Sequence, residues 1–137
     1  LQKKEIITEQ EANVINYRKI YNFTKSFIWN ELQEAKEIYK EKPFYANISS
    51  NEIYGNDTNE MILVQGIIDL YYINKDDMLV LVDYKTDYVE NGKEKELVLE
   101  YQEQLMLYKR ALQEALHRNV DKVYLYSVYL DRAIEVD

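Results

Sequence analysis

Two apolar runs separated by four polar residues most strongly restrict the folds open to this chain. Met61 to Ile73 and Met78 to Tyr84 are rich in the aliphatic and aromatic residues typical of strands, and Asn74-Lys75-Asp76-Asp77 lies between them. Because these four residues favour turns, an antiparallel hairpin is the simplest connection. The sequence therefore predicts a domain built around a β-sheet.

Segments with helical spacing lie on both sides of this hairpin. Thr8 and Glu11 have the spacing of a capping box, which predicts a helix that begins near residue 8 with an apolar face extending to Phe27. Charged and apolar residues alternate at helical spacing from Trp29 to Tyr39, which predicts a second helix. After the Asn91-Gly92 break, residues at steps of three and four predict one long helix to about Arg118: Leu97, Tyr101, Gln104, Tyr108, Leu112 and Ala115.

Two further strands are predicted outside the hairpin. Pro43 favours an extended conformation before it, Phe44 to Ile48 alternates as a strand does, and Ser49 to Asn59 has the composition of a surface loop. Val123 to Leu130 forms the last predicted strand. The expected fold class is α/β (α+β), with a small mixed β-sheet flanked by helices in a single domain over residues 1–137.

Composition excludes several classes of protein. The 137 residues contain no cysteine, which rules out disulfides, cysteine-bound zinc, iron–sulfur clusters and thiol nucleophiles and agrees with a reducing cytoplasm. No apolar run approaches the ~18 residues of a membrane span, and Leu1-Gln2-Lys3-Lys4 does not begin a signal peptide. We expect a soluble, unexported, cytoplasmic chain with no membrane partner. The first residue is not Met, from which we expect a fragment of a longer polypeptide.

Two carboxylates and one lysine lie at the ends of predicted strands. Asp69 ends one apolar run and Asp83 ends another, so a hairpin brings the two carboxylates to neighbouring positions. Two adjacent carboxylates repel unless a cation lies between them, and a divalent metal ion meets that need. Lys85 lies on the same strand face as Asp83, and Asp87 continues that face if the strand extends. Two metal-binding oxygens with an adjacent ammonium suit phosphodiester hydrolysis. A surface salt-bridge ladder at a strand end explains the same spacing.

Three motifs in order resemble the nuclease motifs of the RecB family within the PD-(D/E)xK superfamily. The motifs are Gly66-Ile67-Ile68-Asp69, Asp83-Tyr84-Lys85-Thr86-Asp87 and Tyr101-Gln102-Glu103-Gln104-Leu105-Met106-Leu107-Tyr108. Their flanks, Glu41-Lys42-Pro43-Phe44 and Tyr124-Leu125-Tyr126-Ser127, agree with the same family. The resemblance covers most of the chain and implies a restriction-endonuclease-like fold. Within the family it is strongest to the C-terminal nuclease domains of the A subunits of AddAB-type ATP-dependent helicase-nucleases.

The resemblance implies a metal site on the hairpin. Asp69 and Asp83 would bind Mg²⁺, or Mn²⁺ in its place, together with the backbone carbonyl of Tyr84, and Lys85 would be the catalytic lysine. Gln104 and Tyr108 match the family's Gln-x-x-x-Tyr motif, which positions DNA or active-site elements. For Tyr101, on the same helical face, a core-packing role is the favoured interpretation.

One family ligand has no counterpart in this sequence. The resemblance implies a metal-binding histidine on an upstream helix, whereas His117, the only histidine, follows the Gln-Tyr motif. We expect His117 to lie at the surface near the negative end of the long helix and not to bind metal. The missing ligand is explained if the chain begins after that histidine, and it predicts weak metal binding and slow or absent cleavage by this chain alone.

The resemblance also implies a larger assembly. The absence of cysteines favours the A-type polypeptide over relatives such as the B-type partner, which carry an iron–sulfur cluster. A helicase motor outside this chain would use ATP to deliver single-stranded DNA, and the B-type polypeptide would be the partner in double-strand-break repair by recombination. The expected activity is a metal-dependent deoxyribonuclease (exonuclease), although a net charge of −8 opposes capture of DNA by the domain's own field. A non-catalytic module that docks onto DNA or onto the partner remains the alternative.

Overall fold

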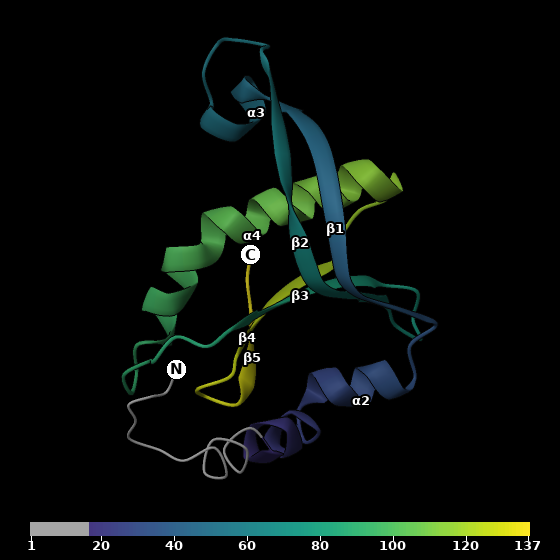
Figure 1. Cartoon of the computed structure of the whole chain (residues 1–137), viewed down its shortest axis with the longest axis vertical. Coiled ribbons are helices and arrows are strands. Elements are labelled where there is room, and N and C mark those ends of the chain that lie inside the picture. The colour runs from purple at the N-terminus through teal and green to yellow at the C-terminus, as the bar shows by residue number, and fades with distance from the viewer. Residues whose placement is uncertain (1–16) are drawn as a thin grey trace, which may run out of the picture.

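A five-stranded mixed sheet forms the centre of the computed structural model, which describes residues 17–137 (Figure 1). In spatial order its strands are β1 (Glu37–Ser49), β2 (Met61–Ile73), β3 (Leu79–Lys85), β4 (Lys122–Ser127) and β5 (Arg132–Glu135). The pairs β1–β2, β2–β3 and β4–β5 are antiparallel, whereas β3 and β4 are parallel and are connected through the long helix α4 (Glu94–Leu116). The prediction of a small mixed sheet with helices is confirmed.

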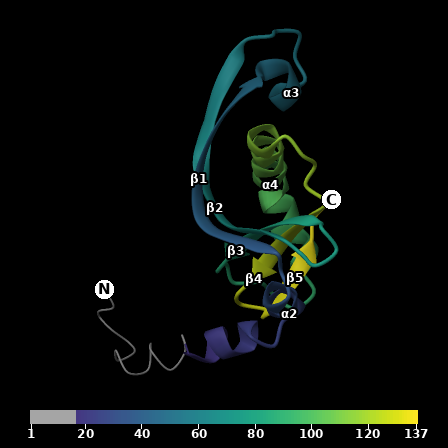
Figure 2. The same ribbon diagram turned by 90° about the vertical axis from the view of Figure 1, so that its right-hand side faces the viewer.

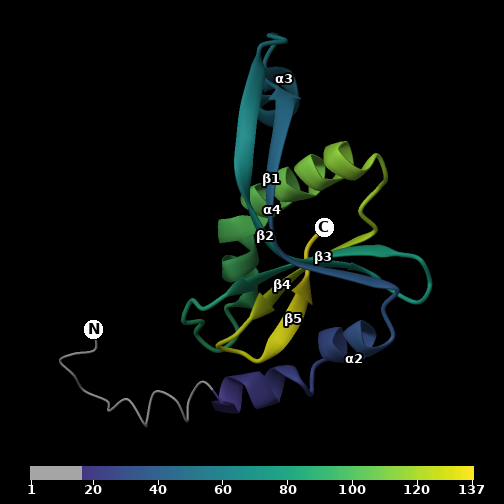
Figure 3. The ribbon, with the colours of Figure 1, turned by 45° about the vertical axis from the view of Figure 1, so that its right-hand side comes forward.

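Helices cover both faces of the sheet. The apolar face of α4 packs on one side, where Leu97, Leu105 and Leu112 are buried in one cluster with residues of β1, β2, β3 and β4. On the other side lie α2 (Phe27–Gln33) and the helical residues 17–23, as Figure 3 shows. Ile28 of α2 is fully buried there against Val80, Val82 and their neighbours. The result is a three-layer domain with a separate apolar cluster on each side of the sheet.

β1 and β2 bend sharply and exchange faces at one register position. Ile68 and Leu70 are two residues apart, so a regular strand would place them on one face, yet Ile68 packs on the α4 side and Leu70 on the α2 side. Asp69 lies between them, and Glu41, directly opposite by register, has a left-handed φ of 52°. Figure 2 shows the two strands curving around α4 beyond this point. The bend therefore places Asp69 where the β2–β3 ladder stops.

The central hairpin and the long helix are confirmed as predicted. The turn between β2 and β3 is closed by the Asn74 side chain, whose Oδ1 accepts hydrogen bonds from the N–H groups of Asp76 and Met78, both at 2.9 Å. α4 ends at Leu116, and its C-cap is His117 in the left-handed conformation. His117 is exposed at this negative helix end, as its position in the sequence predicted.

Four predicted segments were wrong in type or extent. The predicted helix from Trp29 to Tyr39 stops at Gln33, because residues from Glu37 onward pair with β2 and the Tyr39 ring stacks on Tyr71 at 4.8 Å. The predicted strand from Phe44 to Ile48 is the centre of the longer β1. Pro43 lies within this outer strand, the position in a sheet that best tolerates proline.

The predicted loop from Ser49 to Asn59 contains a short helix, α3 (Ser50–Tyr54), because the Ser49 side chain caps its N-terminus and Gly55, with a φ of 69°, ends it. The last predicted strand, Val123 to Leu130, ends at Ser127, whose Oγ accepts the N–H of Leu130 and turns the chain into the unpredicted β5. The capping box at Thr8 and Glu11 lies outside the described residues. Among the described helices, none is long and apolar enough to cross a membrane.

Candidate active site

Asp69 and Asp83 face each other just beyond the last pair of the β2–β3 ladder. Leu70 pairs with Val82, so the next register position places Asp69 opposite Asp83. At this position a side-chain hydrogen bond takes the place of a backbone ladder bond, because Asp69 Oδ2 accepts a hydrogen bond from the N–H of Tyr84 at 2.9 Å. The juxtaposition of the two carboxylates that the hairpin predicted is therefore present in the structure.

Asp83 and Lys85 form a nearly buried ion pair on the α4 side of β3. Lys85 Nζ lies 3.0 Å from Asp83 Oδ2, and the side chains of Lys85 and Asp83 are 17% and 7% exposed. Asp83 Oδ2 receives no well-aligned hydrogen bond. Burial raises the pKa of the Asp83 carboxyl; Lys85 opposes this increase, and the nearby Asp69 carboxylate adds to it. Asp83 is consequently a buried acceptor that its protein neighbours satisfy only in part.

Two side chains of α4 contact the Lys85 ammonium. Lys85 Nζ donates a hydrogen bond to Gln104 Oε1 at 3.0 Å and lies 4.1 Å from the centroid of the Tyr101 ring. The Tyr101 hydroxyl in turn donates to Asp87 Oδ2 at 2.8 Å. Three residues of separation place Tyr101 and Gln104 on one helical face, so both reach the same ammonium.

Tyr108 lies one turn further along α4, beside the carboxylates. Its pKa is raised by burial first and then by the charge of Asp83. The ring packs edge-on against Phe44 of β1, with the centroids 5.1 Å apart. Gly66 makes room for both, because a Cβ at that position would lie 3.0 Å from Phe44 Cε1 and 3.3 Å from the Tyr108 hydroxyl. Gln104 and Tyr108 therefore both border the site.

Tyr101 has a larger role at the site than its spacing predicted. Core packing was the favoured interpretation, and the ring does pack against the core, but it also covers the Lys85 ammonium and binds Asp87. Asp87 does not continue the strand face, because β3 ends at Lys85. The signal available in the sequence was the shared spacing of Tyr101 and Gln104, which does not distinguish a core contact from a contact with Lys85.

The oxygen atoms at this site suit a divalent cation. Two adjacent carboxylates, one with a buried and poorly satisfied oxygen, are the hard ligands that Mg²⁺ and Mn²⁺ prefer. Within residues 17–137 no group of three or more histidine, cysteine or acidic side chains is close enough to hold a metal. His117 caps the far end of α4, roughly 20 Å of helix away from Gln104. The described part of the chain thus supplies a pair of side-chain ligands.

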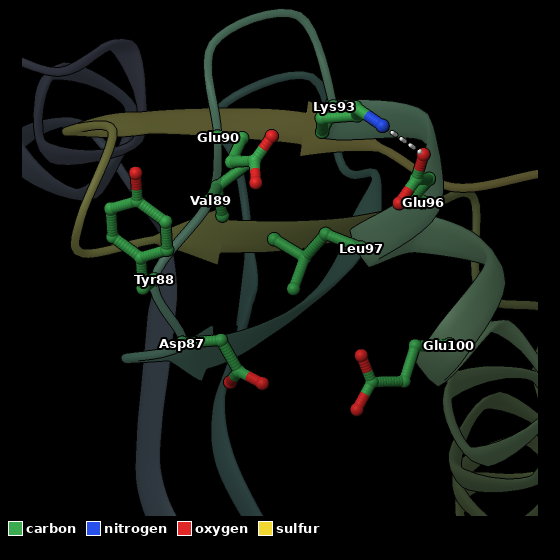
Figure 4. A pocket seen from close by; sticks show the side chains of 8 residues that line it. All are labelled: Asp87, Tyr88, Val89, Glu90, Lys93, Glu96, Leu97 and Glu100. Carbon is green, nitrogen blue, oxygen red and sulfur yellow. Dashed lines mark hydrogen bonds and ion pairs between the residues drawn. The ribbon is translucent and has the colours of Figure 1, made fainter.

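An acidic pocket adjoins the site but is separate from Asp69 and Asp83. It has a volume of about 240 Å³ and lies between the segment after β3 and the first turns of α4 (Figure 4). Its lining includes the carboxylates of Asp87, Glu90, Glu96 and Glu100, and Lys93 is paired with Glu96 at 3.1 Å. This excess of negative charge disfavours phosphate groups in the pocket.

Comparison with known families gives a match along most of the chain. Residues 8–133 match the model of the PD-(D/E)XK nuclease superfamily. Three relatives are named as the A subunits of ATP-dependent helicase/nucleases: proteins from Clostridium novyi, Alkaliphilus oremlandii and Alkaliphilus metalliredigens, which are 38%, 39% and 41% identical over 98%, 97% and 96% of this chain. In each case the aligned region is 11% of the relative's own length.

Proposed function

Because the chain belongs to the PD-(D/E)XK nuclease superfamily, we propose that its described domain hydrolyses phosphodiester bonds of single-stranded DNA with the help of a divalent metal ion. The observation that carries this proposal is the convergence of Asp69, Asp83 and Lys85 at the end of β3. Neighbouring carboxylates with an adjacent ammonium are suited to binding a metal and to offsetting charge on a phosphate that reacts.

Asp69 and Asp83 would hold the metal ion, with Mg²⁺ as the expected ion and Mn²⁺ as a substitute. The backbone carbonyl of Tyr84 is the third proposed ligand. The N–H and C=O of a strand residue point to the same side, and the Tyr84 N–H points at Asp69. When bound, such an ion polarises the phosphate and lowers the pKa of a coordinated water.

Lys85 is the proposed catalytic lysine. Its ammonium lies next to Asp83 and is oriented by Gln104 and by the ring of Tyr101. An ammonium held at this place stabilises negative charge that develops on the phosphate and orients the attacking water. Gln104 and Tyr108 border the same space from α4, and in this proposal they position Lys85 and the DNA strand.

The relatives suggest a wider setting. Since they are named as subunits of helicase/nucleases and are about nine times longer than the matched region, we propose that this domain belongs to a larger polypeptide whose ATP-dependent motor delivers the strand. A strand that is delivered mechanically does not have to be attracted by a domain of net charge −8. A partner B subunit, cytoplasmic location and a role in recombinational repair of double-strand breaks belong to the same proposal.

A docking module without catalysis is the second candidate. The observation that favours it is an exposed apolar surface on the outer face of β1 and β2, where Tyr45, Met61, Leu63 and Ile67 are each more than half exposed. Such a surface is suited to contact with another protein. Titration with Mn²⁺ distinguishes the two candidate functions. A nuclease site should bind Mn²⁺ through Asp69 and Asp83, whereas a pure docking module has no need to bind a metal there.

Cleavage of an end-labelled single strand in Mg²⁺ or Mn²⁺ tests the main proposal. The assay uses the longer polypeptide that contains this domain, because we expect slow or absent cleavage by this chain alone. We expect Asp69→Ala, Asp83→Ala and Lys85→Ala each to lower the cleavage rate at least about 100-fold. Asp57→Ala and Lys95→Ala, which remove exposed charges of the same types, serve as matched controls and should cleave as the wild type does. Cleavage that survives Asp83→Ala would reject the assignment.

A further inference from the structure

Two exposed tyrosines lie at the sheet edge that carries the candidate active site. Tyr88 comes three residues after Lys85, the last residue of β3, and Tyr129 comes two residues after Ser127, the last residue of β4. Lys85 and Ser127 are register partners in parallel strands, so both tyrosines emerge at the same carboxyl edge. Three residues span at most about 10 Å, which keeps Tyr88 close to Lys85.

The two rings touch each other without being covered by the core. Their centroids are 4.9 Å apart and their planes cross at 67°, the edge-on arrangement that aromatic pairs favour. Tyr88 is nevertheless 70% exposed and Tyr129 45% exposed. Much of the apolar ring surface therefore remains accessible to a ligand. We refer to Tyr88 and Tyr129 as the tyrosine pair.

Hydrogen bonds connect the tyrosine pair to the active-site strand and fix its position. The N–H of Val128 donates a hydrogen bond to the backbone carbonyl of Lys85 at 2.9 Å. The turn that contains Tyr129 is therefore hydrogen-bonded directly to the backbone of the proposed catalytic lysine. Lys19 donates to the Tyr129 carbonyl at 3.2 Å and pairs with Asp131 at the end of the same turn. A surface held in this way loses little conformational entropy when it binds a ligand.

The charges around the tyrosine pair favour a neutral ligand group. Tyr88 borders the acidic pocket, whose carboxylates repel phosphates (Figure 4). Three lysines close to the pair along the chain or in space are already matched with acids: Lys85 with Asp83, Lys19 with Asp131 and Lys93 with Glu96. Attraction of the phosphate backbone therefore contributes little here, and an uncharged, flat group suits the exposed rings better.

We propose that the tyrosine pair stacks on an unpaired nucleobase next to the phosphate that would bind at the proposed metal site of Asp69 and Asp83. This inference rests on the proposed function and adds to it a substrate-binding surface. Stacking on tyrosine is tolerant of base identity, because every base has an aromatic face. In a duplex that face is covered by the neighbouring base pairs, so the tyrosine pair selects single-stranded DNA over double-stranded DNA.

Binding of a fluorescent oligothymidine tests the proposal, with Ca²⁺ replacing Mg²⁺ and a gel confirming that the DNA stays intact. We expect Tyr88→Ala and Tyr129→Ala to weaken single-strand binding at least about fivefold, the lower end of the effect of one stacked base. Tyr88→Phe keeps the ring and should stay within about twofold of the wild type. Tyr54→Ala, which removes an equally exposed tyrosine from α3, is the matched control and should bind normally.

The DNA supplies a second, independent variable. An oligothymidine with one abasic position should bind the wild type more weakly when that position meets the tyrosine pair, and Tyr88→Ala should abolish the difference. If both alanine variants bind single strands as tightly as Tyr54→Ala does, or if the abasic scan has no position that depends on Tyr88, stacking is rejected. All variants should melt like the wild type, because the substituted side chains are exposed.

Cleavage separates failure of this inference from failure of the proposed function. If Asp83-dependent cleavage is present while the tyrosine variants bind normally, the nuclease stands and stacking is rejected. If tyrosine-dependent binding is present while the longer polypeptide that contains this domain shows no Asp83-dependent cleavage, stacking stands and the catalytic proposal falls.

Discussion

The surroundings of Asp83 shift the pKa of its carboxyl in opposite directions. Its burial and the nearby Asp69 disfavour its ionised form, while Lys85 favours it, and burial has the largest effect on its pKa. A carboxyl whose pKa is higher in the folded chain than in the unfolded chain binds its proton more tightly when folded. Its contribution therefore favours folding below about pH 4 and is lost as the pH rises through the raised pKa.

Replacing this carboxyl with an amide should stabilise the metal-free chain. We expect Asp83→Asn to unfold at a higher urea concentration than the wild type at about pH 8 in EDTA, and the advantage to shrink at a second, acidic pH closer to the raised pKa of Asp83. The exposed substitution Asp57→Asn is the control for general charge effects. If Asp83→Asn is instead less stable by the same amount at both pH values, the ion pair with Lys85 outweighs burial.

The ring of Tyr101 is predicted to matter more than its hydroxyl. Tyr101→Phe keeps the ring over the Lys85 ammonium and removes only the hydrogen bond to Asp87, whereas Tyr101→Leu removes the cation–π contact, which is worth about 0.5–2 kcal/mol. In single-turnover cleavage, the rate of Tyr101→Phe should stay within about twofold of the wild-type rate, and Tyr101→Leu should be about 3- to 10-fold slower. Equal rates for the two variants would assign Tyr101 to the core alone.

The positions of three site residues were predictable from the hairpin and from the period of one strand. The hairpin brings Asp69 opposite Asp83, and the two-residue period of β3 places Lys85 on the same face as Asp83. Tyr101 was not predictable in the same way. An aromatic residue at helical spacing looks identical whether it meets Leu or Lys, and only the way in which α4 packs on the sheet distinguishes the two.

At the scale of elements, the exchange of faces in β2 decides where the site lies. Residues 61–73 are apolar in both phases of the alternation, so the sequence pattern gives no sign that the inward face changes at Asp69. The short elements were missed for a related reason. β5 has four residues and α3 has five, and both depend on hydrogen bonds to neighbours, such as that from Leu130 to Ser127, more than on local propensity.

Gly66 tests the close contact between β2 and α4. In Gly66→Ala the added methyl group would meet Phe44 at 3.0 Å and the Tyr108 hydroxyl at 3.3 Å, so those rings must move. We expect a loss of about 1–3 kcal/mol in the free energy of unfolding, measured with urea, together with slower cleavage. Gly92→Ala is a poor control because its φ is 81°, so Asn47→Ala on the outer face of β1 is preferable. An unchanged midpoint would mean that the two rings are loosely packed.

At the scale of the whole molecule, binding of the proposed metal ion should stabilise the folded state. A ligand that binds only the folded state stabilises it by RT ln(1 + [L]/Kd), which is about 1.4 kcal/mol at ten times Kd. Mn²⁺ should therefore raise the melting temperature of the wild type, and isothermal titration should detect its binding. Asp69→Asn and Asp83→Asn should lose both effects, while Asp57→Asn keeps them. Equal stabilisation of all four proteins would favour the docking candidate.

The position of β1 at the edge of the sheet affects the tendency of this domain to aggregate. It is an outer strand of thirteen residues, and such a strand presents unpaired backbone groups to which another chain can add. Three features at its centre oppose that addition: Pro43 has no N–H to offer, Lys40 and Lys42 bring charge, and Glu41 breaks the extended conformation. The same bend that brings Asp69 to Asp83 therefore also protects the open edge of the sheet against aggregation.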